Sequence, residues 1–107
     1  MADLKEQVRR KLRVTWDNDE ATKERIDKDI IPTADADLRF KIGIPDDMPF
    51  DFSKPGTENK LFLAHCYYQW NDAEDEFESN YAADLAHARR KWEVSQYAEA
   101  QEPSSDV

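Results

Sequence analysis

Apolar residues recur at four-residue steps in several stretches of the chain and predict amphipathic helices. Near the N-terminus, Leu4, Val8 and Leu12 form one narrow stripe. Asp3 precedes this stripe and Glu6 follows three residues later, which is the spacing of a helix N-cap and a capping box. We therefore expect a first helix that begins after Asp3 and lies on a surface.

A second stripe at four-residue steps predicts a longer helix in the middle of the chain. It consists of Thr22, Ile26, Ile30, Ala34 and Leu38. Asp17, with Glu20 three residues later, predicts the N-cap of this helix. Pro32 interrupts the stripe, because proline lacks a backbone N–H and its ring clashes with the carbonyl four residues earlier. We expect either a kink there or a helix that stops near Ile31 and restarts, with the pattern ending by Gly43.

Residues 43–56 have no helical or strand period and contain three prolines, so they predict a loop. At about 14 residues the loop is near the length at which structureless connections become uncommon and tend to carry function. It holds Met48, Phe50 and Phe52, which a free solvent loop has little reason to contain. We therefore predict that these three side chains bind a partner.

Two more helices are expected after the loop. The third begins around Thr57 and is apolar on nearly every face over residues 61–70, which predicts that other elements surround it. The fourth begins in the acidic run at 72–78, where carboxylates favour a helix N-terminus, and continues to about Tyr97. Its expected apolar face is Phe77, Tyr81, Leu85, Ala88 and Trp92.

These elements predict an all-α fold. The 107 residues contain only two glycines, too few for the frequent turns of a β-sandwich or barrel. We expect a four-helix bundle-like domain over residues 1–97, with a long loop between its second and third helices. Residues 98–107 are polar and are expected to form a flexible C-terminal tail.

Charge and composition restrict the class of protein. The formal net charge of −9 argues against a general nucleic-acid or anionic-membrane binder. No apolar run approaches the roughly 20 residues that span a bilayer, and the N-terminus is charged from Asp3, unlike a signal peptide. The single cysteine, Cys66, excludes an intrachain disulfide and fits a reducing compartment. A soluble, acidic, intracellular protein is expected.

No catalytic or cofactor-binding motif emerges. A phosphate-binding glycine loop, a CxxC pair and a Ser/His/Asp set are all lacking in the sequence. His65 and His87 have no ligand-like spacing and are expected to be hydrogen-bonded core or surface residues. The Asp17–Asp19 run resembles the start of a calcium loop but has Thr22 at the glycine position. We therefore expect no enzymatic activity, no metal and no cofactor.

Clusters of charge leave three interpretations open. Basic residues gather in the first helix and again late in the fourth, and acidic residues gather at the start of the fourth. They could bind phosphate, contact the opposite charges of a neighbouring subunit, or simply be solvated helix faces. The residues predicted for contacts between subunits are Arg9, Arg10, Arg13, Asp72, Glu74, Glu76, Arg89 and Arg90.

The order of these helices and their aromatic residues resembles the head–tail connector (adaptor) proteins of tailed bacteriophages. The more specific part is LFLAHCYYQWNDAEDEFESNYAADLAHARRKWEV, residues 61–94. It is similar to the third helix of that family, the turn through Asn71, Asp72 and Ala73, and a long fourth helix. The segment LKEQVRRKLRVTWDNDEATKERIDKDI resembles the first two helices. Pro32 and the proline-rich loop depart from the family pattern.

The resemblance implies a ring of about twelve copies beneath the portal of the virion head. Such a ring extends the DNA channel, lets DNA pass without specific binding, and docks the next tail-side stopper or completion protein. The implied location is the head–tail interface of the virion, and the host cytoplasm during assembly, with no membrane. The C-terminal segment from Trp92 would face the portal, through Trp92, Tyr97, Pro103 and Val107.

Two other functions remain open. A small helical adaptor or regulator would bind one protein partner through Met48–Phe52 and stay a monomer or dimer. An acidic DNA mimic would place its charges along one face, but here 24 acidic residues are mixed with 15 basic ones, which counts against it.

Overall fold

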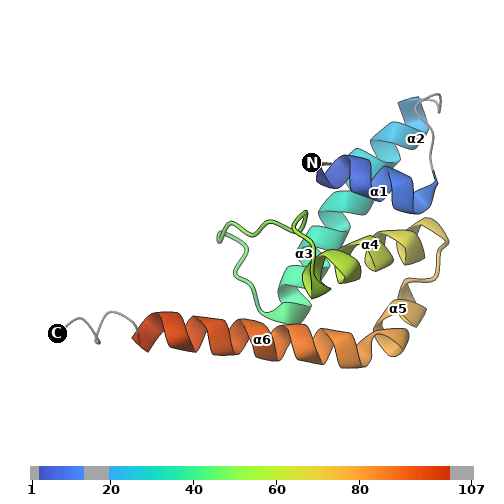
Figure 1. The fold of residues 1–107 in the computed structure, drawn as a ribbon. Helices are drawn as coiled ribbons and strands as arrows, with labels where there is room; N and C mark the ends of the chain where they lie inside the picture. Colours follow the sequence, from blue (N-terminus) through green and yellow to red (C-terminus); the bar gives the residue numbers. More distant parts are fainter. Residues whose placement is uncertain (1–2, 14–19, 102–107) are drawn as a thin grey trace.

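The computed structural model describes residues 3–13 and 20–101, and its regular structure is helical throughout these ranges (Figure 1). The all-α prediction is confirmed. The predicted N-cap at Asp17 and the Asp17–Asp19 run lie outside the described residues. The elements in chain order are α1 (Leu4–Leu12), α2 (Glu20–Arg25), the π-helical η1 (Ile26–Ile30), α3 (Ile31–Ile42), α4 (Thr57–Trp70), α5 (Glu74–Asn80) and α6 (Ala82–Gln101).

Helix α1 forms as its capping signal predicts. The Glu6 backbone N–H donates to the Asp3 side chain at 2.8 Å, so the N-cap satisfies one of the free donors of the first turn. Val8 and Leu12 are buried, and Leu4 packs partly against the same core. The helix ends at Arg13, whose left-handed conformation (φ 60°) stops the ladder. The apolar stripe thus fixes α1 against α4.

Pro32 neither stops the second predicted helix nor forces it to restart. Helices α2 and α3 are joined through η1, in which the Ile31 backbone N–H donates to the Ile26 carbonyl, five residues back. This wider turn comes immediately before Pro32, which then occupies the first turn of α3, where its missing N–H is tolerated. The helical rod therefore continues from Glu20 to Ile42 (Figure 1).

Helix α4 lies at the centre of the fold, as its all-round apolar sequence predicts. It contacts α1, α3, α5 and α6 and buries Leu61, Phe62 and Cys66 completely. The stripe Ile26, Ile30, Ala34 and Leu38 is buried against it from the η1–α3 rod. The helices thus pack as a bundle-like domain around α4.

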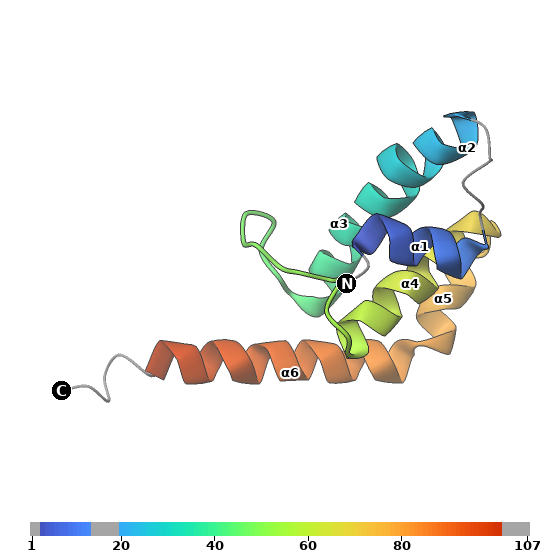
Figure 2. The same cartoon turned by 45° about the horizontal axis from the view of Figure 1, so that its top comes forward.

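The predicted fourth helix is wrong in one respect, because the structure breaks it into α5 and α6. Tyr81 leaves helical geometry (φ −116°, ψ 18°), while its ring stacks on Phe77 with centroids 5.2 Å apart. The turn lets α5 pack on α4 while α6 crosses the end of α3. Figures 1 and 2 show α6 running on past the rest of the molecule.

Helix α6 also extends further than predicted. It continues through Gln101 instead of ending at about Tyr97, so the first residues of the predicted tail, 98–101, are helical. Residues 102–107, the remainder of the predicted tail, lie outside the described residues.

Candidate interaction surface

One aromatic side chain on α3 stands out because it is left uncovered. Phe40 is 83% exposed, the highest value among the exposed large hydrophobic residues of the described chain. Pro32, Ala36 and Phe40 follow one another at four-residue steps, so they share a face of the helix that is distinct from the buried Ala34 and Leu38 stripe. Helix α3 therefore has an outer apolar face as well as an inner one.

Phe40 lines two hollows on this surface. The larger, about 700 Å³, lies between α3, α5 and α6, with Phe40 on one wall and Ala82 and Ala86 on another. Glu78 and Arg89 contribute charged groups to it. The other hollow, about 490 Å³, includes Pro32 and Ala36. We call the larger hollow the Phe40 groove.

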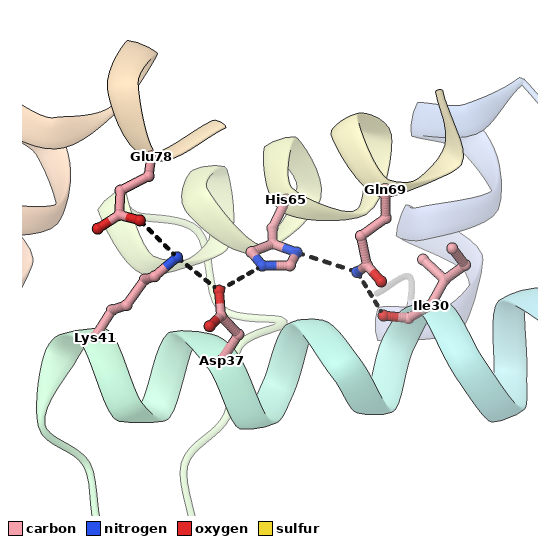
Figure 3. A network of polar contacts seen from close by, with 6 residues as sticks. All are labelled: Ile30, Asp37, Lys41, His65, Gln69 and Glu78. Atoms are coloured by element: carbon pink, nitrogen blue, oxygen red, sulfur yellow. Dashed lines mark hydrogen bonds and ion pairs between the residues drawn. The ribbon is translucent and has the colours of Figure 1, made fainter. Parts of the chain in front are cut away.

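The groove residues Asp37, Lys41 and Glu78 belong to a polar network that continues into the core (Figure 3). Asp37 Oδ2 lies 2.9 Å from Lys41 Nζ and 2.7 Å from His65 Nε2. Lys41 Nζ also approaches Glu78 Oε2 at 3.6 Å, so the chain of contacts joins α3, α4 and α5. His65 is buried, while Asp37 remains about one-third exposed in the groove.

Gln69 sets the proton position on His65. Its Nε2 donates to the Ile30 carbonyl at 2.9 Å and also lies 3.1 Å from His65 Nδ1. Because an amide N–H only donates, Nδ1 acts as the acceptor in this arrangement and the N–H directed at Asp37 is on Nε2. The prediction that His65 is a hydrogen-bonded core residue is confirmed. The network also joins the groove residues Asp37 and Lys41 to this buried histidine.

Charge and burial shift two pKa values near this network. Burial alone would raise the pKa of Asp37, but hydrogen bonds from Lys41 and His65 outweigh it and hold that pKa below its usual value. Burial raises the pKa of the Cys66 thiol to about 12, which keeps the thiol protonated at neutral pH. Asp37 is therefore a fixed negative charge, whereas Cys66 is an inert core side chain.

The outer part of α6 provides a second uncovered surface. Val94 is 61% exposed and Tyr97 is 69% exposed. Trp92, on the opposite side of the same helix, packs against the body and donates from Nε1 to the Gly43 carbonyl at 3.1 Å. The helix is therefore anchored at Trp92 and presents Val94 and Tyr97 beyond that anchor.

The structure corrects the partner-binding prediction for one of the three loop residues, Phe52. Phe52 is only 2% exposed and its ring lies 4.9 Å from that of Phe62 in the core. Phe50 contacts Phe52 and Trp92, and Met48 is partly buried against the core. Phe52 thus cannot be a partner contact in this conformation, since it already fills a place in its own domain.

Hydrogen bonds explain why the loop turns inward. Arg39, itself buried, donates to the Pro45 and Met48 carbonyls. Farther along, Asn59 Nδ2 donates to the Phe52 carbonyl at 2.8 Å and Gln7 Nε2 donates to the Ser53 carbonyl at 3.0 Å. The loop's free carbonyls are thus satisfied by side chains of three helices, which lets its aromatic residues enter the core.

The residues predicted to face a portal separate into two groups. Trp92 is half-buried and holds the loop to α6, so it is not a free contact. Tyr97 is exposed as such a contact requires. Pro103 and Val107 lie outside the described residues.

The residues predicted to make charge contacts between subunits are also divided. Arg9 Nη2 lies 3.0 Å from Asp27 Oδ2 within the chain and the Arg9 side chain is only 17% exposed, which does not fit its assignment to a subunit interface. The others lie on exposed surfaces, although several have weak partners in their own chain. Arg10 pairs with Glu6, Asp72 with Arg25, and Arg89 with Glu93, while Arg13, Glu74, Glu76 and Arg90 are exposed.

The described residues contain neither a metal-binding cluster nor a helix that could span a membrane. No group of three or more His, Cys, Asp or Glu side chains is placed to hold a metal ion. Within the same ranges, none of the helices has the length and apolar character needed to cross a membrane.

No protein-family model, curated protein or solved structure matches this chain. Sequence reasoning missed the Phe40 groove, although the Pro32, Ala36 and Phe40 spacing was a signal that α3 has a second apolar face.

Proposed function

We propose that this protein is a non-enzymatic structural subunit that assembles with copies of itself, and that it acts as a head–tail connector of a tailed bacteriophage. The observation that carries the proposal is the outer part of α6. This helix extends beyond the body of the molecule (Figure 2). Two of its large apolar residues, Val94 and Tyr97, are exposed.

Phe40 supports an assembly role independently of α6. A small domain has little reason to expose a large aromatic side chain beside a groove unless another surface covers it. Phe40 is on α3, whereas Val94 and Tyr97 are on the outer part of α6. Two different apolar surfaces on one chain favour head-to-tail contacts, which close into a ring when the rotation between copies permits.

The connector part of the proposal rests on the resemblance of residues 61–94. In this role a ring of about twelve copies would sit beneath the portal of the virion head and extend the DNA channel. The partners would be the portal protein and a tail-side stopper or completion protein. The net charge of −9 suits a channel wall that repels DNA phosphates instead of binding them.

Negative-stain electron microscopy and native mass spectrometry, with and without the portal protein of the same phage, test this function. We expect rings of about a dozen copies, either from the chain alone or on the portal. A chain that forms no closed ring under either condition, and does not bind the portal, would exclude the connector role.

A small adaptor that binds one partner is the second candidate, and a different hollow favours it. This hollow, about 450 Å³, lies beside the loop and is lined in part by Pro49, Phe50, Pro55 and Trp92. Prolines and aromatic rings suit an extended peptide. The adaptor function predicts a stable monomer or dimer where the connector predicts rings.

A further inference from the structure

We propose that the Phe40 groove of one copy binds the outer face of α6 from a second copy, through Arg90, Val94 and Tyr97. We call these three residues the α6 strip. The inference deepens the proposed assembly function and rests on it, because it names the two surfaces that meet.

The α6 strip has the form of a helical recognition face. Arg90, Val94 and Tyr97 follow one another at steps of four and three residues, so they lie on one side of the helix. Ala88 and Trp92, which pack against the body, lie on the other side. The strip is thus an exposed apolar face with one cation, as in helices that bind in grooves.

The Phe40 groove has the complementary form. The groove has a volume of about 700 Å³ and lies between α3, α5 and α6. Ala82 and Ala86 in its lining are small enough to let another helix approach closely. Phe40, exposed on the wall of the groove, offers an aromatic surface for Tyr97 and Val94. Contact would cover the large apolar residues that a single copy leaves exposed on these two helices.

Charge complementarity favours a second copy as the occupant. Glu78 lines the groove and is mostly exposed, and Glu74, Asp75 and Glu76 add carboxylates on the same short helix. Within the groove, Lys41 is already engaged with Asp37 and Glu78. Arg89, the other cation that lines the groove, pairs with Glu93, whereas Arg90 on the strip has no ion pair with the described residues.

The strip cannot reach the groove of its own chain. Ala86 is on the groove and Val94 is on the strip, yet both belong to the continuous helix α6. A rigid helix holds them about 12 Å apart along its axis, at 1.5 Å per residue. The strip must therefore meet the groove of another copy. Two copies joined by one such contact still have one unoccupied groove and one unoccupied strip, so further copies can add.

Cysteine pairing between two different variants tests the contact directly. One chain carries Ala86→Cys in the groove and the other carries Val94→Cys in the strip, and the buried Cys66 serves as the inert background. We expect mild oxidation of an equimolar mixture to give mainly the mixed disulfide dimer, at least about tenfold more than Lys60→Cys mixed with Val94→Cys. Lys60, exposed on α4, is the matched control. A mixed yield no higher than this control overturns the proposal.

Complementation gives the second, independent measurement. Phe40→Asp blocks the groove and Tyr97→Asp blocks the strip, and each single variant is expected to weaken self-association about 30-fold or more. A mixture of the two retains one intact groove and one intact strip, so native mass spectrometry should show a one-to-one heterodimer and no larger species. Circular dichroism checks that both variants are folded. Symmetric dimers of Phe40→Asp alone would instead show a strip-to-strip contact and would also overturn the proposal.

These outcomes separate the contact from the connector function. Rings that form on the portal with Phe40→Asp and Tyr97→Asp as readily as with the unmodified chain would retain the connector and exclude the contact. Mixed pairing by cysteine, with no rings on any portal, would retain the contact and exclude the connector.

Discussion

The loop at 43–56 and the outer part of α6 differ in both backbone regularity and burial, and the irregular segment is the more buried of the two. The loop has no regular secondary structure, yet its Phe52 side chain is buried, and Arg39 and Asn59 donate hydrogen bonds to backbone carbonyls of the loop. The end of α6 is regular, yet it leaves Val94 and Tyr97 exposed. Regular hydrogen bonding and burial are separate properties, and burial decides which residues remain available to a partner.

The largest expected effect that tests this difference comes from Phe52→Ala. Truncating a buried phenylalanine removes its transfer free energy and leaves a cavity, so the free energy of unfolding should fall by about 3–5 kcal/mol. Urea unfolding of the purified chain measures it. Phe40→Ala, the same change at an exposed position, is the matched control and should change stability by less than about 0.5 kcal/mol in an unassembled sample. Equal losses for the two variants would show that Phe52 is not buried in solution.

The polar network beneath the Phe40 groove gives the next effect. Asp37→Ala removes the acceptor of the buried His65 Nε2–H, so the loss of stability at neutral pH should be about 1–3 kcal/mol. The folded pKa of Asp37 lies below the ordinary 3.8, so its carboxylate stabilises the fold above that pH. The stabilisation is lost as the pH falls through the folded pKa.

The unfolding free energies of the unmodified chain and of Asp37→Ala should therefore begin to converge as the pH falls below about 3.8. Asp35→Ala, on the same helix but paired with Arg39, serves as the control for a general loss of negative charge. A difference between the unmodified chain and Asp37→Ala that stays constant down to pH 2 would contradict the assignment.

The sequence predicts those parts of the structure that depend on residues close together in the chain. The Asp3 cap, the ends of α4 and the α3 terminus at Gly43 depend on neighbouring residues, and they agree with the sequence predictions. The break at Tyr81 does not, because the four-residue steps from Phe77 through Tyr81 to Leu85 continue unchanged across it. At that turn the Tyr81 ring packs on Tyr68 of α4 as well as on the neighbouring Phe77, and the contact with α4 cannot be read from the local pattern.

The candidate site was harder to predict for the same reason. A helix pattern identifies the buried stripe, but it does not say whether Pro32, Ala36 and Phe40 on another face will be covered. That depends on where α5 and α6 lie after the break at Tyr81. The loop illustrates the opposite error, since its apolar residues suggested a free surface before Arg39 and Asn59 were known to bind its carbonyls.

Trp92→Phe tests the junction between the two regions and should have a smaller effect. It keeps an aromatic ring beside Phe50 but removes the N–H that donates to the Gly43 carbonyl. One neutral hydrogen bond at a partly exposed site is expected to contribute about 0.5–1.5 kcal/mol. Thermal unfolding measures the loss. Trp70→Phe is the matched control on α4, because the Trp70 ring makes no hydrogen bond with the described residues, and it should lose less stability. A loss below that of the Trp70 variant would show that the bond does not hold the loop to α6.

The smallest expected effect is that of Tyr97→Ala on the stability of the isolated chain. Tyr97 is 69% exposed, so truncation should change the free energy of unfolding by less than about 0.5 kcal/mol. The same variant removes an aromatic side chain from the α6 strip and should weaken association between copies. Chemical unfolding at low protein concentration should therefore show almost no change for this substitution, whereas sedimentation at high concentration should show weaker association. A Tyr97→Ala chain that unfolds as readily as Phe52→Ala would place Tyr97 in the fold of the single copy, and the distinction between the buried loop and the exposed helix end would fail.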